Sequence, residues 1–309
     1  MRPAAAPANP AAAPNIEELI GADPGKTDRT AGATFGGEHR MSFIKGFFAF
    51  LRDIIKDRRI LWTLAKNDFK ARFAASFLGG FWAFAQPLVT LLVLWFVFEV
   101  GFRNPPISNV PFIVWLTPAY LVWSFFSEAL VAGANCIQEY SYLVKKVNFR
   151  VSMIPIGKII SSAFIHLGFI IFIFFLLIVY RIPLSIYNLQ VFYYFLCTAF
   201  LLLGMCWMLS AITPFVKDVS SIVSIFIQIG FWMTPIFWSP DNMSPKVQTL
   251  LKINPMFYIC RGYRDSFIDH VWFWQRGFTN WEFWFIAVLF FAFGAYLFKK
   301  LRPQFADVL

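Results

Sequence analysis

Six ionisable side chains lie within or beside long apolar runs of the sequence, where a membrane-embedded enzyme would hold its acid, base or nucleophile. They are Glu99, Glu128, His166, Lys217, Asp218 and Glu282. A glycosyl- or acyltransferase would need one of the glutamates to converge with Asp218 or His166, but the spacing traces no proton relay. A single histidine on a Phe- and Ile-rich helix is more typical of a packing residue that bonds a neighbouring helix. The transferase is kept as an alternative for this chain.

Metal, nucleotide and nucleic-acid sites are not predicted. The 4 cysteines include no CxxC pair and the 3 histidines are scattered, so the sequence holds no metal-ligand spacing. Residues 21–27, GADPGKT, resemble a phosphate-binding loop, but the motif is one residue short of GxxxxGK[ST] and no predicted strand precedes it. The net charge of +10 comes from basic residues beside apolar runs, where anionic lipid and membrane orientation account for them better than nucleic acid does.

The elements that would position any functional side chain are membrane helices. With 59% hydrophobic and 14% charged residues, the sequence predicts an all-α polytopic membrane protein. Six runs approach the roughly 20 residues that a bilayer requires. These transmembrane helices are expected near residues 78–100, 112–133, 159–180, 189–215, 219–238 and 283–298.

Loop charge predicts the orientation of these helices. Cations are concentrated before the first run, between the second and third, and after the last, so both termini are expected in the cytoplasm. Residues 1–40 are rich in Ala, Pro and Gly and are predicted to form a disordered tail. Residues 41–73, which include Lys70 and Arg72, have the apolar spacing of amphipathic helices at the membrane interface. Packing against another part of the same protein is an equally open alternative for this segment.

The stretch after the fifth run is too apolar for a solvated loop and too interrupted for a spanning helix. Prolines break it at Pro235, Pro240 and Pro245, yet apolar runs continue between them. Backbone that leaves helical geometry at membrane depth is tolerated where protein buries it or where it lines a wet cavity. Residues 239–281 are therefore predicted to form re-entrant helices on the outer side.

Aromatic residues are more numerous than interfacial belts require. Their faces can stack on the apolar faces of sugar rings, which would suit a path for a polymer, while lipid anchoring and core packing remain the alternative for each residue. The candidate path residues are Trp82, Trp123, Phe126, Phe231, Trp232, Phe237 and Trp238.

Several stretches together resemble the membrane subunit of polysaccharide-exporting ABC transporters, the class that exports lipid-linked O-antigen, teichoic acid and capsule. The stretches are DFKARFAASFLGGFWAFAQPL at 68–88, LVWSFF at 121–126, LVKKVNF at 143–149, Lys217-Asp218, Asn254-Pro255-Met256 with Arg261 downstream, and PQFAD at 303–307. The resemblance covers residues 41–309. It departs from the family pattern at Arg150, where proline is common, and at Lys217, where arginine is more frequent.

The resemblance implies a permease in the bacterial cytoplasmic (inner) membrane that is not itself an enzyme and that works as a homodimer. A separate cytoplasmic ATPase would bind ATP and Mg, and would contact a coupling region at residues 135–158. The resemblance places Lys145, Lys146, Phe149 and Arg150 at that contact. The outer cap would include Pro235, Asn254, Pro255, Met256, Arg261 and Arg264. Arg261 and Arg264 would either hold the cap in place or meet the phosphate of a lipid carrier. A permease for a small lipid or drug shares this architecture and is the main alternative.

Overall fold

The computed structural model describes residues 52, 56–73, 78–103, 107–145 and 150–309. These residues form helices joined by short turns, and Asp57–Leu309 make up one compact unit. The predictions for the tail at 1–40, for the first part of the amphipathic segment, and for Lys146 and Phe149 lie outside the described residues. The all-helical class predicted from composition is confirmed for the part that is described.

Five helical segments are long and apolar enough to cross a membrane, so the multi-pass prediction is confirmed in the described chain. The first joins α4 (Phe81–Trp95) to a π-helix, η1 (Phe96–Gly101). The others are α5 (Phe112–Glu139), α7 (Met153–Val179), η2 with α8 (Ile186–Gln190 and Val191–Ile212), and α12 (Phe278–Leu301) with the short helices that follow it.

The predicted fifth span, 219–238, is shorter than expected. Helix α9 covers Val219–Met233 and ends at Thr234, whose backbone is extended with φ −84° and ψ 134°. Thr234 precedes Pro235, and the residue before a proline is disfavoured in helical geometry. Residues 234–237 are buried as non-helical chain. Five helices of the described part therefore reach spanning length, rather than six.

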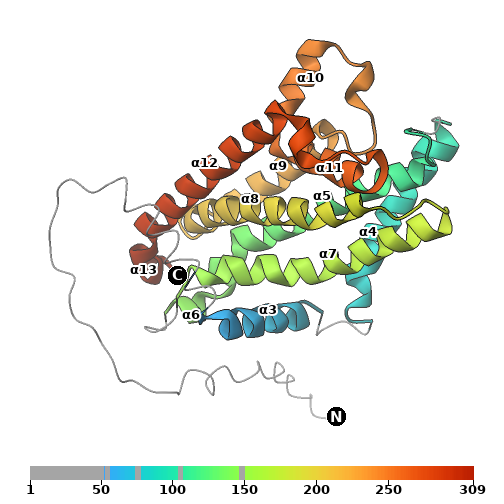
Figure 1. Ribbon diagram of the computed structural model, residues 1–309. Helices are drawn as coiled ribbons and strands as arrows, with labels where there is room; N and C mark the ends of the chain where they lie inside the picture. Colours follow the sequence, from blue (N-terminus) through green and yellow to red (C-terminus); the bar gives the residue numbers. More distant parts are fainter. Residues whose placement is uncertain (1–51, 53–55, 74–77, 104–106, 146–149) are drawn as a thin grey trace, which may run out of the picture. The chain divides into compact units, whose positions relative to one another are not determined.

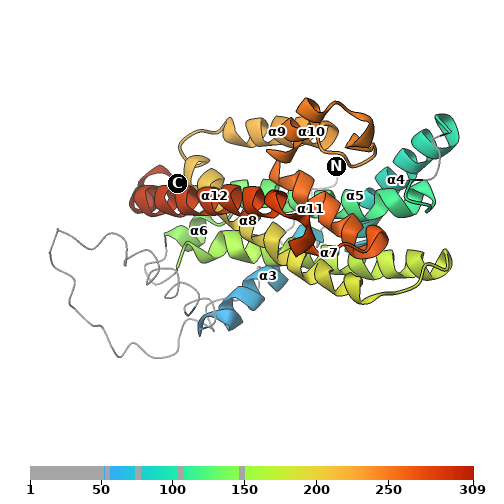
Figure 2. The same ribbon diagram turned by 45° about the horizontal axis from the view of Figure 1, so that its top comes forward.

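Helix α5 is the centre of the unit and contacts α4, α7, α8, α9 and the short helix α11 (Pro255–Arg264). In the most apolar stretch of each segment, 78% of the residues in α5 are buried, but only 11% of those in Phe81–Gly101. Helix α12 runs along α8 in both ribbon views (Figure 1, Figure 2). A Cβ atom at Gly294 would lie 2.1 Å from the carbonyl oxygen of Gly204, so glycine is required where these two helices touch.

Helix α3 (Arg58–Phe73) lies against α7 (Figure 1). Leu61, Leu64 and Ala65 form its buried face, and a Cβ atom at Gly157 of α7 would lie 2.6 Å from Leu64. On the opposite face, Trp62 is 50% exposed. Packing within the same protein, one of the two alternatives left open by the sequence, therefore holds for the inner face of α3.

The region predicted as re-entrant contains several short helices, listed here with their bounds: η3 (Pro240–Asn242), α10 (Pro245–Lys252), α11, η4 (Asp265–Asp269) and η5 (Phe273–Arg276). Proline opens η3, α10 and α11, a position where its missing N–H costs nothing. Helix α11 is largely buried against α5, α8 and α12, whereas α10 stands clear of the bundle (Figure 1). The predicted helices are present, and their depth in a membrane stays a prediction.

Candidate functional site

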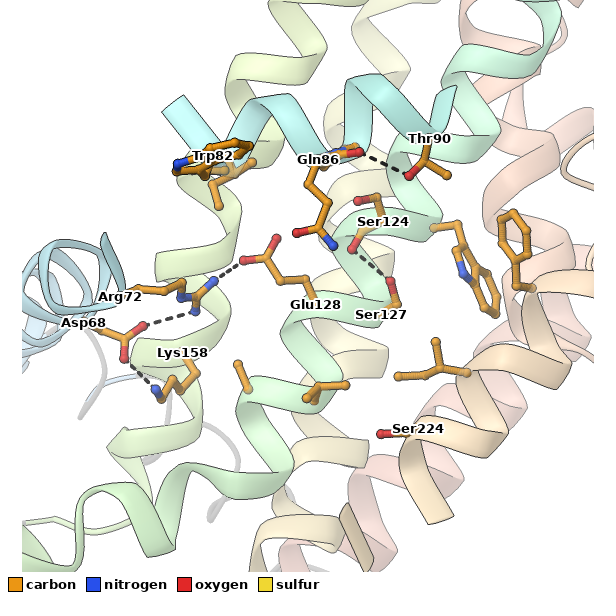
Figure 3. A pocket seen from close by; sticks show the side chains of 18 of the residues that line it. Asp68, Arg72, Trp82, Gln86, Thr90, Ser124, Ser127, Glu128, Lys158 and Ser224 are labelled. Atoms are coloured by element: carbon orange, nitrogen blue, oxygen red, sulfur yellow. Dashed lines mark hydrogen bonds and ion pairs between the residues drawn. The ribbon is translucent and has the colours of Figure 1, made fainter. Parts of the chain in front are cut away.

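A cavity of about 1130 Å³ lies between α4, α5 and α9, and reaches α3 and α7 at one end (Figure 3). Helix α5 contributes one face to it, with lining residues 120, 123, 124, 127, 128 and 131 at the spacing of three and four that places side chains on one side of a helix. Along α4, the lining side chains Trp82, Gln86 and Thr90 are exposed, so the cavity is open on that side.

Aromatic rings from three helices form part of the wall. Trp82 belongs to α4, Tyr120 and Trp123 to α5, and Phe231 to α9. The Phe231 ring centroid lies 6.3 Å from that of Trp123 and 6.5 Å from that of Tyr120. A Cβ atom at Gly230 would lie 2.8 Å from the Trp123 indole, so a glycine in α9 allows the helix to approach this ring.

Uncharged polar groups occupy the rest of the wall. Thr90, Ser127 and Ser224 donate their hydroxyls to carbonyl groups of their own helices, at 3.0–3.1 Å. The side chains of Gln86 and Gln228 and the hydroxyl of Ser124 make no hydrogen bond with any described residue. Figure 3 shows Gln86 and Ser124 pointing into the same space between α4 and α5. The wall thus offers free amide and hydroxyl groups to whatever occupies the cavity.

Charged side chains gather at the end of the cavity where α3, α5 and α7 meet (Figure 3). Arg72 pairs with Glu128 and, at 3.3 Å, with Asp68. Lys158 pairs with Asp68 at 2.6 Å and with Glu139. We call this series, Glu128–Arg72–Asp68–Lys158–Glu139, the charged chain. It joins α3 to both α5 and α7.

Asp68 is the central carboxylate of the charged chain and is 5% exposed. Burial alone would raise the pKa of Asp68, but the Lys158 ammonium and the Tyr140 hydroxyl, which donates to Asp68 at 2.9 Å, hold that pKa below its ordinary value. The carboxyl is therefore ionised at neutral pH and accepts from partners on two other segments.

The structure brings three of the predicted path aromatics, Trp82, Trp123 and Phe231, to the cavity, and places the other four elsewhere. Phe126 is buried behind Trp123, with ring centroids 5.5 Å apart, and Phe237 is buried as well. The remaining two lie near each other: Trp232 is 57% exposed, and Trp238 donates its indole N–H to the Trp232 carbonyl at 3.2 Å. A role in a polymer path stays a prediction for all seven.

The predicted coupling residues that the structure describes lie on the surface. Lys145 follows the short helix α6 (Ser141–Val144) and is exposed. Arg150, also exposed, pairs with Asp57 at 3.0 Å, just before α3 begins. In the interface segment, Lys70 is exposed while Arg72 belongs to the charged chain.

Among the predicted cap residues, Arg264 is buried, with 5% of its surface exposed. Its guanidinium donates to the carbonyl groups of Trp115 at 3.2 Å, Pro235 at 2.7 Å and Ile236, and stacks 3.4 Å from the centre of the Trp115 ring. The structural role left open by the sequence is therefore the one that Arg264 has. The side chain of Arg261 makes no hydrogen bond or ion pair with the described residues.

Asn254, Pro255 and Met256 form the start of α11. The Asn254 side chain accepts from the Met256 N–H at 3.0 Å and donates to the Thr234 hydroxyl at 2.8 Å. Pro255 occupies the first helical position, and Met256 is buried. The cap helix is thus tied to the chain that follows α9.

The residues considered for transferase chemistry do not converge. His166 bonds the Tyr263 hydroxyl at 2.8 Å and packs against the rings of Phe125 and Phe195, which confirms the packing interpretation. Glu128 is held by Arg72 and by Ser162, at 3.3 Å from the serine hydroxyl. Within the described residues no hydrogen bond or ion pair joins His166 to Glu99, Glu128, Asp218 or Glu282. Nor does the described part of the chain contain a group of three potential metal-ligating acids, histidines or cysteines.

Sequence reasoning did not find the charged chain or the free polar groups of the wall. Arg72 and Glu128 are 56 positions apart, and Tyr140 and Asp68 are 72 apart, so no local pattern reports these pairs. The helical spacing of Ser124, Ser127 and Glu128 within an otherwise apolar span was a usable signal for the polar face of α5.

Comparison with known proteins gives one family and several relatives. A family model described as ABC-2 type transporter matches residues 59–268. An O-antigen export system permease protein RfbA of Klebsiella pneumoniae is 25% identical over 265 residues, which cover 81% of this chain and 95% of the relative. A second Klebsiella pneumoniae protein of that name is 24% identical over 266 residues, with the same coverage. The Myxococcus xanthus protein of that name is 25% identical over 228 residues, covering 71% of this chain and 84% of the relative.

Proposed function

The chain belongs to the ABC-2 type transporter family, and from that premise we propose that it is the permease subunit of a transporter that exports a lipid-linked polysaccharide of the O-antigen kind. The observation that carries the proposal is the cavity between α4, α5 and α9, in a member of this family, with a wall of aromatic rings and uncharged polar groups. Aromatic faces and free amides suit the two sides of a sugar ring, its C–H face and its hydroxyls.

A second copy of the chain completes the path in this proposal. Helices α4 and α9 flank the cavity and expose apolar side chains that the rest of the unit does not cover, among them Val89, Leu92, Ile225 and Ile229. Large exposed apolar surfaces mark contacts with lipid or with another chain. Facing copies would close the open side of each cavity, while the remaining apolar surface would contact lipid.

Energy comes from a separate ABC ATPase, which holds ATP and Mg in this proposal. Membership in the family implies such a partner. The exposed surface that includes Lys145 and Arg150, near the charged chain, is where we place its contact. The permease then lies in the cytoplasmic membrane with both termini inside, α9 completes a sixth crossing, and α10 and α11 form the re-entrant outer cap.

The size and polarity of the cavity argue against the alternative function, a permease for a small lipid or drug. Its volume of about 1130 Å³, counted for one chain, already exceeds the roughly 300–1,000 Å³ of small-ligand pockets. An open cavity whose wall carries free polar groups favours an extended polar substrate over a compact apolar one.

Export from proteoliposomes tests the proposal. The chain and its cognate ATPase are reconstituted with an undecaprenyl-pyrophosphate-linked glycan, and we expect the glycan to cross the membrane only with ATP. The control is the same assembly with the ATPase lysine that contacts ATP replaced by alanine, which abolishes transport. Glycan transport by the chain without its ATPase, or transfer of sugar by the chain alone, would contradict the proposal.

A further inference from the structure

The charged groups of the cavity wall carry a net negative charge. The described lining residues include two cations, Arg72 and Lys158, and three carboxylates, Asp68, Glu128 and Glu139. Their formal sum, two positive charges and three negative charges, is one negative charge. The charged chain begins and ends on a carboxylate, and each cation lies between two acids.

Neither cation is free to meet an anionic substrate. Lys158 is only 6% exposed and is held by Asp68 and Glu139. Arg72 is more accessible, but its two terminal nitrogens are directed to Glu128 and Asp68. A substrate phosphate that recruited either cation would leave a partly buried carboxylate without its partner, which is strongly unfavourable.

The remaining wall has polarity without charge. Gln86 of α4, Ser124 of α5 and Gln228 of α9 each line the cavity, and their side chains have no hydrogen-bond partner among the described residues. Amides and hydroxyls both donate and accept, as sugar hydroxyls do, so these contacts need no charge on either side. The indole of Trp82, which is 52% exposed, adds a surface for the apolar face of a sugar.

We propose that this cavity selects a polymer whose repeating unit is uncharged, and discriminates against a polyanion such as a polyol-phosphate chain. The inference rests on the proposed export function and narrows its substrate class. Each anionic repeat that passes the charged chain meets a net charge of its own sign, and the described lining residues offer it no unpaired cation. The repulsion is repeated for every anionic unit of the polymer. A neutral glycan meets only hydrogen-bonding and stacking groups.

The test compares two polymers of equal length on the same undecaprenyl pyrophosphate carrier. One is a neutral hexose polymer and the other is the same polymer with one phosphate group on each hexose, so the sugar backbone is constant and the charge of the repeat differs. In proteoliposomes that contain the chain and its ATPase, we expect the neutral polymer to cross at least about tenfold faster, because juxtaposed like charges repel each other.

A charge introduced into the wall sharpens the test. Gln228→Lys places a cation on α9, which contributes no carboxylate to the cavity, and should raise the rate for the phosphorylated polymer severalfold relative to the neutral polymer. Ser221→Lys is the matched control, since Ser221 is exposed on the same helix but does not line the cavity; it should leave the ratio unchanged.

The possible outcomes distinguish a failure of charge selection from a failure of the proposed export function. Equal rates for the two polymers with the unmodified chain would overturn charge selection and leave export intact. Failure to move either polymer, with ATP hydrolysis still active, would overturn the export function and the inference with it. The comparison in the unmodified chain decides the matter even when a lysine variant does not fold.

Discussion

Two arginines each connect a helix to the rest of the bundle, one through backbone carbonyl groups and the other through carboxylates. Arg264 holds α11, with its guanidinium directed at the backbone carbonyls of Trp115, Pro235 and Ile236. Arg72 holds α3, with its guanidinium directed at the carboxylates of Asp68 and Glu128. The first anchor is buried and its acceptors do not titrate, whereas the second is part of a partly exposed network of ionisable side chains.

Because of this difference, we expect the position of α11 to be fixed and the position of α3 to be adjustable. Helix α11 is surrounded by α5, α8 and α12, and its anchor satisfies backbone groups left free by the break at Pro235. Helix α3 rests mainly on α7, and its anchor depends on protonation states and on side chains that line the cavity. We expect conditions that rearrange the charged chain to move α3 while α11 stays in place.

Removing the fixed anchor should have the largest effect on stability. Arg264→Met leaves three buried carbonyls without their donor, and we expect the free energy of unfolding to fall by about 3–5 kcal/mol. Unfolding by SDS titration in detergent micelles measures it. Arg261→Met, on the same helix, is the matched control and should change the free energy by less than about 0.5 kcal/mol, because Arg261 has no such contacts. Equal losses for the two variants would remove the basis of the comparison.

Acid should weaken the adjustable anchor selectively. The pKa of Asp68 is lowered in the folded protein, so its contribution to stability is complete above its unfolded pKa of about 3.9 and is lost as the pH falls through the folded value. The stability difference between the unmodified chain and Asp68→Asn should be constant from pH 7 to about pH 5 and shrink below about pH 4.

The corresponding difference for Arg264→Met is the internal control for the acid experiment. The hydrogen-bond acceptors of Arg264 are backbone carbonyls, so that difference should change less with pH than the difference for Asp68→Asn. Its remaining pH dependence comes from the nearby carboxyl groups of Asp265 and Asp269. A difference for Asp68→Asn that is flat down to pH 3 would show that the carboxylate does not anchor α3.

The smallest effect on stability is expected at the surface pair of Arg150 and Asp57. Replacing Arg150 and Lys145 by glutamate should change the free energy of unfolding by less than about 1 kcal/mol, since exposed ion pairs contribute little. Stimulated ATP hydrolysis by the partner ATPase should nevertheless fall, because charge reversal at a contact introduces repulsion. Lys246→Glu on α10 is the control that should leave hydrolysis unchanged. Full hydrolysis with the double variant would place the ATPase contact elsewhere.

The sequence determined the class of the molecule and most of its helices by itself. Runs of apolar residues near the length of a bilayer can satisfy their backbone groups only as helices in lipid, so composition and length were enough. The prolines at 235, 240 and 245 likewise marked chain breaks, because a proline lacks the N–H that a helix interior needs. The motifs and their order along the chain were enough to indicate the family.

Only the tertiary structure decided which side chains share the cavity and which cations are free. Trp123 and Phe126 lie three residues apart on the same helix and both are buried, yet only Trp123 borders the cavity. Arg264 and Arg261 differ little in sequence context, yet one binds three carbonyls and the other none. The charged chain joins residues from three helices far apart in the sequence, and its geometry follows from packing, which no local pattern encodes.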